Sequence, residues 1–169
     1  MNSSLWQRLD AIARSMFPVT ATLLLILASM VPLRVPDLAP IIPSLSLIAV
    51  YYWSIHRPDL MPVWAVFAIG VTQDMLSGGM LGVASIVLLL VRHLVITQAR
   101  FFTSASIVVI WSIFALVAPF AFFVMWFLTS LASATLVEYR PAVFQCLMTL
   151  AFYPCFTWFF VHGQRLFLR

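Results

Sequence analysis

Asp74 is the acidic residue that the sequence places within an apolar stretch, and its carboxylate is the first group with a capacity for chemistry. It lies in GVTQDMLSGGMLG, residues 70–82. An ionised carboxylate inside a membrane is costly and is by default a candidate for transport or for partner contact. Near a helix end the same oxygens can instead accept amide hydrogens from the turn or from the start of the next helix. Both interpretations stay open, as does an ion pair with Arg34 or Arg140.

Glycines lie close to Asp74 in the sequence, and their spacings indicate either helix packing or a turn. Gly70 precedes Asp74 by four residues and therefore shares its helix face. Gly78 and Gly82 form a G-x-x-x-G pattern, which allows close helix packing when it lies inside a helix. The doubled glycine at 78 and 79 favours a tight turn between two helices instead. The candidate structural or partner-interface residues are Gly70, Asp74, Ser77, Gly78, Gly79 and Gly82.

The remaining polar residues match no catalytic, metal-binding or nucleic-acid-binding pattern. His56, His93 and His162 are far apart and lack the closely spaced ligands that zinc requires. The sequence contains neither a G-x-x-x-x-G-K-[ST] loop nor a G-x-S-x-G elbow. The nine basic residues are all Arg and are spread singly, without the basic stripe that nucleic acid requires. We therefore predict no enzymatic activity, no metal, no cofactor and no nucleic-acid partner.

The composition identifies lipid as the main solvent of the protein. Apolar residues make up 64% of the 169 residues and charged residues only 8%. Soluble domains carry about 25% charged residues, so an ordinary soluble enzyme and a disordered chain are excluded. A segment that spans a membrane must be a helix or part of a closed barrel. Because the apolar runs are continuous rather than alternating, the sequence predicts an all-α integral membrane protein.

The apolar runs predict six transmembrane helices in a single transmembrane domain over residues 1–169. Their approximate bounds are 15–33, 41–56, 60–77, 79–97, 104–134 and 142–163. The fifth run allows either one long helix kinked at Pro119 or two short helices. One helix places seven Arg on the side of both termini and two on the other, whereas two helices give five against four. The positive-inside rule therefore favours six spans with cytoplasmic N- and C-termini.

A short interfacial helix is predicted before the first span. Leu5, Leu9, Ile12 and Met16 recur at helical spacing and form one apolar face, next to Trp6 as an interfacial anchor.

Three patches of the sequence resemble the MreD family of bacterial rod shape-determining membrane proteins. They are PSLSLIAVYYWSIHRP at 43–58, GxxxDxLSGxxLG at 70–82 and RPAVF at 140–144. Together with length and span order, the resemblance covers most of the chain, although the fifth span matches only in hydrophobicity.

The resemblance implies a non-enzymatic component of the elongasome in the bacterial cytoplasmic (inner) membrane. Such a protein supports peptidoglycan synthesis during cell-wall elongation and hence rod shape. The implied partners are MreC, RodA, a class B penicillin-binding transpeptidase, the MreB filament and membrane lipids. The implied fold is similar to the six-helix substrate-binding component of energy-coupling-factor transporters.

Two functions from different classes are compatible with these observations. In the first, the protein is a scaffold whose helices receive the transmembrane helices of partners. In the second, it is a solute-binding component of a transporter, and Asp74 contacts the ligand. Transport requires a polar cavity, and one acidic residue with scattered Ser and Thr offers too few polar groups to line one. We therefore expect the scaffold.

Overall fold

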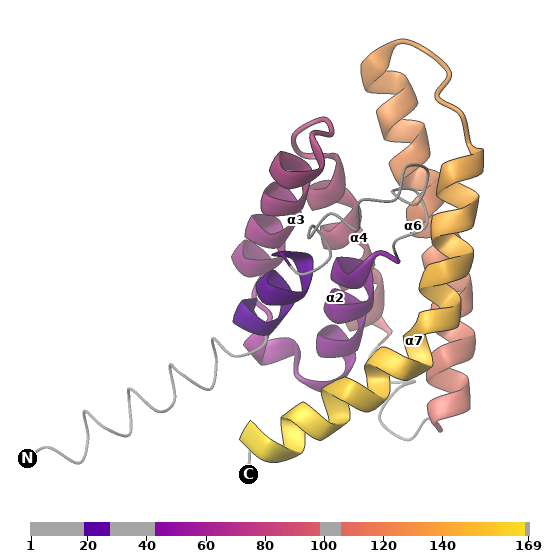
Figure 1. Ribbon diagram of the computed structural model, residues 1–169. Helices are drawn as coiled ribbons and strands as arrows, with labels where there is room; N and C mark the ends of the chain where they lie inside the picture. The colour runs from indigo at the N-terminus through magenta and orange to yellow at the C-terminus, as the bar shows by residue number, and fades with distance from the viewer. Residues whose placement is uncertain (1–18, 28–42, 99–105, 168–169) are drawn as a thin grey trace, which may run out of the picture.

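The computed structural model describes residues 19–27, 43–98 and 106–167, and within these ranges the regular structure is entirely helical (Figure 1). Residues 19–27 form a helix within the first predicted span. The elements that follow are α2 (Leu45–His56), the 3₁₀ turn η2 (Pro58–Leu60), α3 (Val63–Ser77), α4 (Val83–Thr97), α6 (Ile107–Ser133) and α7 (Arg140–Phe167). The predicted interfacial helix around Leu5–Met16 lies outside the described residues, as does Arg34.

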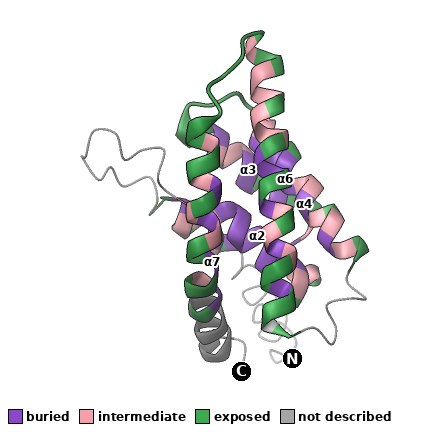
Figure 2. Cartoon of the chain, turned by 90° about the vertical axis from the view of Figure 1, so that its right-hand side faces the viewer, coloured by how far each residue is buried: buried purple, intermediate pink, exposed green. Residues whose placement is uncertain are grey.

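Helix α2 lies at the centre of the molecule. All nine residues from 46 to 54 are buried, and the helix packs against α3, α4 and α7. Figure 2 shows this concentration of buried residues on α2, whereas α6 and α7 carry long exposed faces. A helix that is apolar on every side is suited to such a position, because it presents no polar face that requires water.

A cluster of three aromatic rings joins α2 to α6 and α7. The ring of Tyr51 lies 4.8 Å from that of Phe114 and 5.8 Å from that of Tyr153. Phe114 and Tyr153 are themselves stacked at 4.2 Å. The Tyr51 hydroxyl donates a hydrogen bond to the carbonyl oxygen of Ile110 at 2.9 Å. Because this hydroxyl has a buried acceptor, the polar end of the tyrosine is compatible with an apolar core.

The described residues contain two helical hairpins, α3–α4 and α6–α7. Their turns lie at the same end of the molecule, and α7 runs to the opposite end (Figure 1). Helix α6 runs from Ile107 to Ser133 with Pro119 inside it. The long fifth run therefore contains one helix and does not turn at this proline.

The helices begin and end at residues somewhat different from the predicted span limits. Helix α3 begins at Val63 rather than near 60, because η2 and the extended Pro62 precede it. Helix α4 begins at Val83 rather than 79, because Gly82 has a left-handed φ of 99°. Helix α7 covers the predicted 142–163 and extends beyond it at both ends.

Length and composition identify one membrane-crossing helix among the described residues, Val108–Ser133 within α6. Helices α3 and α4 are apolar but have 15 residues each. At 1.5 Å per residue they are roughly 22 Å long, which is less than the ~30 Å hydrocarbon core of a bilayer.

Candidate functional site: the α3–α4 turn

The glycine-rich segment predicted as a turn connects α3 to α4. Gly78 ends α3 with φ of 66°, and Gly82 precedes α4 with φ of 99°. Residues with a Cβ rarely adopt this left-handed region, so both positions favour glycine. The G-x-x-x-G pattern of Gly78 and Gly82 therefore reverses the chain and does not form a contact surface inside a helix.

The Asp74 carboxylate closes this turn. The residue is only 5% exposed. Its Oδ2 accepts a hydrogen bond from the backbone N–H of Gly82 at 2.7 Å, and both oxygens lie 3.2 Å from the amide nitrogen of Ala84. Of the arrangements left open by the sequence, the structure contains the contact with the start of the next helix.

This arrangement makes Asp74 a cap for α4 supplied from α3. The first amides of a helix have no intrahelical acceptor, and a side chain at the N-cap position usually provides one. The N-cap residue here is Gly82, which has no side chain. A carboxylate also interacts favourably with the positive end of the helix dipole. Because both carboxylate oxygens of Asp74 accept hydrogen bonds from backbone amides of the same chain, the carboxylate serves as a structural hydrogen-bond acceptor.

At Gly70 the backbones of the two helices come close together. A Cβ added at this residue would lie 2.4 Å from the Cα of Ser85 and 2.6 Å from its backbone nitrogen. The Ser85 hydroxyl donates to the carbonyl oxygen of Phe67 at 3.3 Å. Gly70 and Asp74, one helical turn apart, therefore hold the hairpin through close backbone packing and through the cap.

Ser77 and Gly79 contribute less to the hairpin. The Ser77 hydroxyl donates to the backbone oxygen of Asp74 at 3.4 Å, at the long end of the hydrogen-bond range. A Cβ on Gly79 would meet only this hydroxyl, also at 3.4 Å, which is an ordinary contact distance.

Apolar side chains surround the turn on its outer surface. Met75 and Leu76 at the end of α3, and Met80 and Leu81 in the turn itself, are all exposed. We call these four residues the turn surface. It combines a backbone restrained by the cap with flexible Met side chains, which adapt well to partner surfaces.

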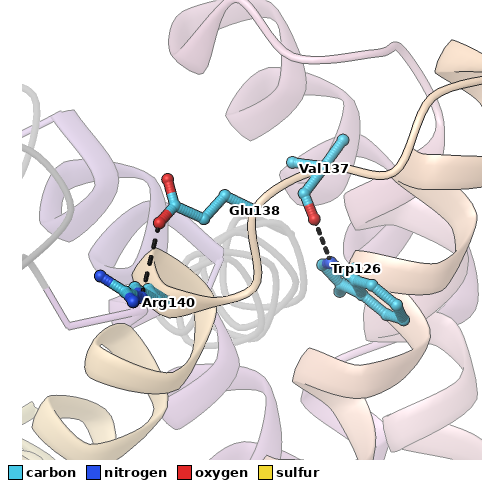
Figure 3. A network of polar contacts seen from close by, with 4 residues as sticks. All are labelled: Trp126, Val137, Glu138 and Arg140. Atoms are coloured by element: carbon cyan, nitrogen blue, oxygen red, sulfur yellow. Dashed lines mark hydrogen bonds and ion pairs between the residues drawn. The ribbon is translucent and has the colours of Figure 1, made fainter.

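Arg140, one of the two arginines considered as partners of Asp74, lies beside another carboxylate. Its Nε is 3.7 Å from Oε1 of Glu138 in the α6–α7 turn (Figure 3). Both side chains are largely exposed, so this pair contributes little to stability.

The described histidines and cysteines form no metal site. His56 stacks on Tyr52 with ring centroids 4.2 Å apart, at the end of α2. Among the described residues, no group of three His, Cys, Asp or Glu side chains is close enough together to hold a metal ion. Cys146 and Cys155 are both free thiols on α7.

Besides the bond from Tyr51 to Ile110, two more long-range hydrogen bonds had no signal in the sequence. Arg92 Nε donates to the carbonyl oxygen of Met61 at 2.8 Å, and the backbone N–H of Ser44 donates to Thr149 Oγ1 at 3.0 Å. They connect positions 31 and 105 residues apart, and no local pattern identifies such pairs. The sequence also offered no reason to select Ser85, because its role depends on Gly70, which it faces across the α3–α4 hairpin.

Comparison with known proteins identifies one family. The family model of the rod shape-determining protein MreD matches residues 11–162. The chain therefore belongs to the MreD family, which gives it a role in rod shape determination as a bacterial membrane protein. No curated protein and no solved structure shows a significant match.

Proposed function

We propose that this member of the MreD family is a non-enzymatic scaffold of the bacterial elongasome, acting in the inner membrane. Its task is to bind the transmembrane segments of other components and so to support peptidoglycan synthesis along the cell cylinder. The partners are those implied by the family: MreC, RodA, a class B penicillin-binding transpeptidase and, at the cytoplasmic side, the MreB filament.

The observation that carries this proposal is the turn surface on a restrained hairpin. A docking surface binds more tightly when its backbone is ordered before the partner arrives, because less conformational entropy is lost. The cap by Asp74 and the close packing at Gly70 supply that order. The exposed Met75, Leu76, Met80 and Leu81 then supply an apolar area for a partner helix.

The alternative, a solute-binding transporter component, receives less support. The larger groove between α6 and α7 is lined almost entirely by apolar and aromatic side chains, which do not suit a polar solute. The cavity beside Gln73, between α2, α3, α4 and α6, has a volume of about 10 Å³. That volume suits roughly one water molecule, whereas sites for small ligands enclose about 300–1,000 Å³. Asp74, the acidic residue considered for ligand contact, is engaged by backbone amides instead.

The proposed arrangement is a single domain of six spans, as in the substrate-binding component of energy-coupling-factor transporters, with both termini cytoplasmic. The direction of the described helices supports it. Both hairpin turns lie at one end of the molecule (Figure 1), and α4 and α7 run toward the other end with Arg92 and Arg165 in their later parts. Arg-rich ends favour the cytoplasmic side.

A topology reporter tests this arrangement. We expect that alkaline phosphatase, which is active only in the periplasm, is inactive when fused after Arg169 and active when inserted at Leu136 in the α6–α7 turn. A fluorescent protein that folds only in the cytoplasm should give the reverse result at both positions. Phosphatase activity after Arg169 would refute the proposed cytoplasmic C-terminus.

The turn surface makes a prediction for partner binding. We expect that Met75→Ala combined with Leu81→Ala reduces the amount of tagged MreC that copurifies in mild detergent by about tenfold or more, since truncating central apolar contacts costs ~1–2 kcal/mol each. The measurement is the ratio of MreC to this protein after affinity purification from membranes.

The matched control is Leu136→Ala, which truncates an exposed leucine in the other turn at the same end of the molecule. Its copurification ratio should equal that of the wild type. Equal losses in the two variants would argue against the turn surface as the docking site, as would an unchanged ratio in the double variant.

A further inference from the structure

An apolar groove lies between α6 and α7. Its volume is about 500 Å³, which lies within the ~300–1,000 Å³ typical of ligand sites. Phe122 and Cys146 form a buried floor, whereas Phe123 and Leu147 on the rims are exposed. The groove is therefore open along one side of the α6–α7 hairpin and accessible from outside the protein.

The end of the groove at the α6–α7 turn is amphipathic. Trp126 lines the groove and donates its indole N–H to the carbonyl oxygen of Val137 at 2.8 Å (Figure 3). Tyr139 lines the same end and is exposed. Trp and Tyr are typical of the boundary between lipid tails and headgroups, which places this end of the groove at the membrane surface.

A pair of opposite charges flanks Tyr139 at this boundary. Glu138 and Arg140 are 3.7 Å apart, and their side chains are 67% and 74% exposed. An ion pair of such exposure is weak, so each partner is free to exchange the other for an external group of opposite charge. Neither charged residue lines the groove itself, but both are peptide-bonded to Tyr139, which does, so one cationic and one anionic group lie next to its end.

We propose that the groove binds a phospholipid of the phosphatidylethanolamine class. One acyl chain lies along Phe122, Phe123 and Leu147, the phosphate binds Arg140, and the ammonium group binds Glu138. The headgroup carries one positive and one negative charge and so matches the residue pair. An anionic phospholipid could satisfy only Arg140 and would leave its headgroup beside the carboxylate.

The shape of the groove favours an acyl chain over a partner helix. Packed helices are about 8–10 Å apart, and a helix with its side chains is about 10–12 Å wide. The backbone of a partner helix would therefore stay outside the rims at Phe123 and Leu147, and only its side chains could reach the floor at Phe122 and Cys146. A single acyl chain is narrow enough to reach that floor.

Native mass spectrometry of the purified full chain tests the proposal without any partner protein. The protein is exchanged into detergent with equal amounts of dioleoyl phosphatidylethanolamine and dioleoyl phosphatidylglycerol. We expect one bound phosphatidylethanolamine, preferred by about fivefold, the ratio that one exposed ion pair can contribute. Glu138→Gln should abolish this preference, and Arg140→Gln should reduce the binding of both lipids.

A matched pair of valines separates the groove from the rest of the lipid-facing surface. Val143 and Val108 are both exposed, but only Val143 lines the groove. Val143→Phe should displace the lipid, while Val108→Phe should bind it as the wild type does. The proposal fails if the wild type binds the two lipids equally or if Val143→Phe retains the lipid.

Discussion

Asp74→Leu is expected to lower the stability of the protein by about 1–4 kcal/mol. The buried Ala84 amide and the part-buried Gly82 amide lose their acceptor, and an unsatisfied donor that is fully buried costs ~1–3 kcal/mol. Asp74→Asn should cost only ~1 kcal/mol, since its carbonyl oxygen can still accept from the same neutral donors. The measurements are the level of each variant in the membrane and the thermal unfolding of the purified protein.

The matched control for this series is Asp59, an exposed carboxylate in η2 at the opposite end of α3. Asp59→Leu should change stability by no more than ~0.5 kcal/mol, as is usual for surface substitutions. If Asp74→Asn is as harmful as Asp74→Leu, the negative charge itself is required, either by the positive end of the α4 dipole or by a cationic partner. A fully stable Asp74→Leu would show that the cap contributes nothing.

Gly70→Ala is expected to destabilise the α3–α4 hairpin by about 1–3 kcal/mol, the usual cost of overpacking a well-packed interior. Its Cβ would lie 2.4 Å from the Cα of Ser85, so two helix backbones must separate. A side chain that rotates away cannot relieve this contact, because the obstructing atoms belong to the backbone. Thermal unfolding of the purified variant measures the effect.

Gly79→Ala is the control, since the new Cβ would meet only the Ser77 hydroxyl at 3.4 Å. This variant should be as stable as the wild type or slightly more stable. At Gly78 and Gly82 a Cβ would have open space, but their left-handed φ should cost roughly 1–2 kcal/mol. Equal stability of Gly70→Ala and Gly79→Ala would refute the close approach at Gly70.

The architecture at the level of elements could be predicted because it depends on local properties. Continuous apolar runs require helices in lipid, and glycines at 78 and 82 permit the left-handed backbone of a tight turn. The single helix around Pro119 was chosen from the distribution of Arg, and α6 is indeed one helix. The MreD resemblance, drawn from three short patches, is confirmed by the match over residues 11–162.

The roles within the candidate site depended on contacts that sequence spacing cannot supply. The acceptor role of Asp74 requires that Gly82 and Ala84 fold back onto it across the turn. The sequence favoured a turn at Gly78 and Gly82 and offered close packing there only as the alternative. The close contact lies instead at Gly70, which Ser85 of the next helix faces.

Composition by itself determined that the protein is a helical membrane protein, because 8% charged residues cannot cover a soluble surface and lipid supplies no hydrogen bonds to the backbone. Only the tertiary structure decided that α2 is central and that α6 and α7 enclose a groove. Residues that face lipid and residues that face protein are equally apolar in a membrane, so hydrophobic periodicity does not separate them. Which residues form the buried core therefore depends on which helices pack together, and those packing contacts join residues far apart in the sequence.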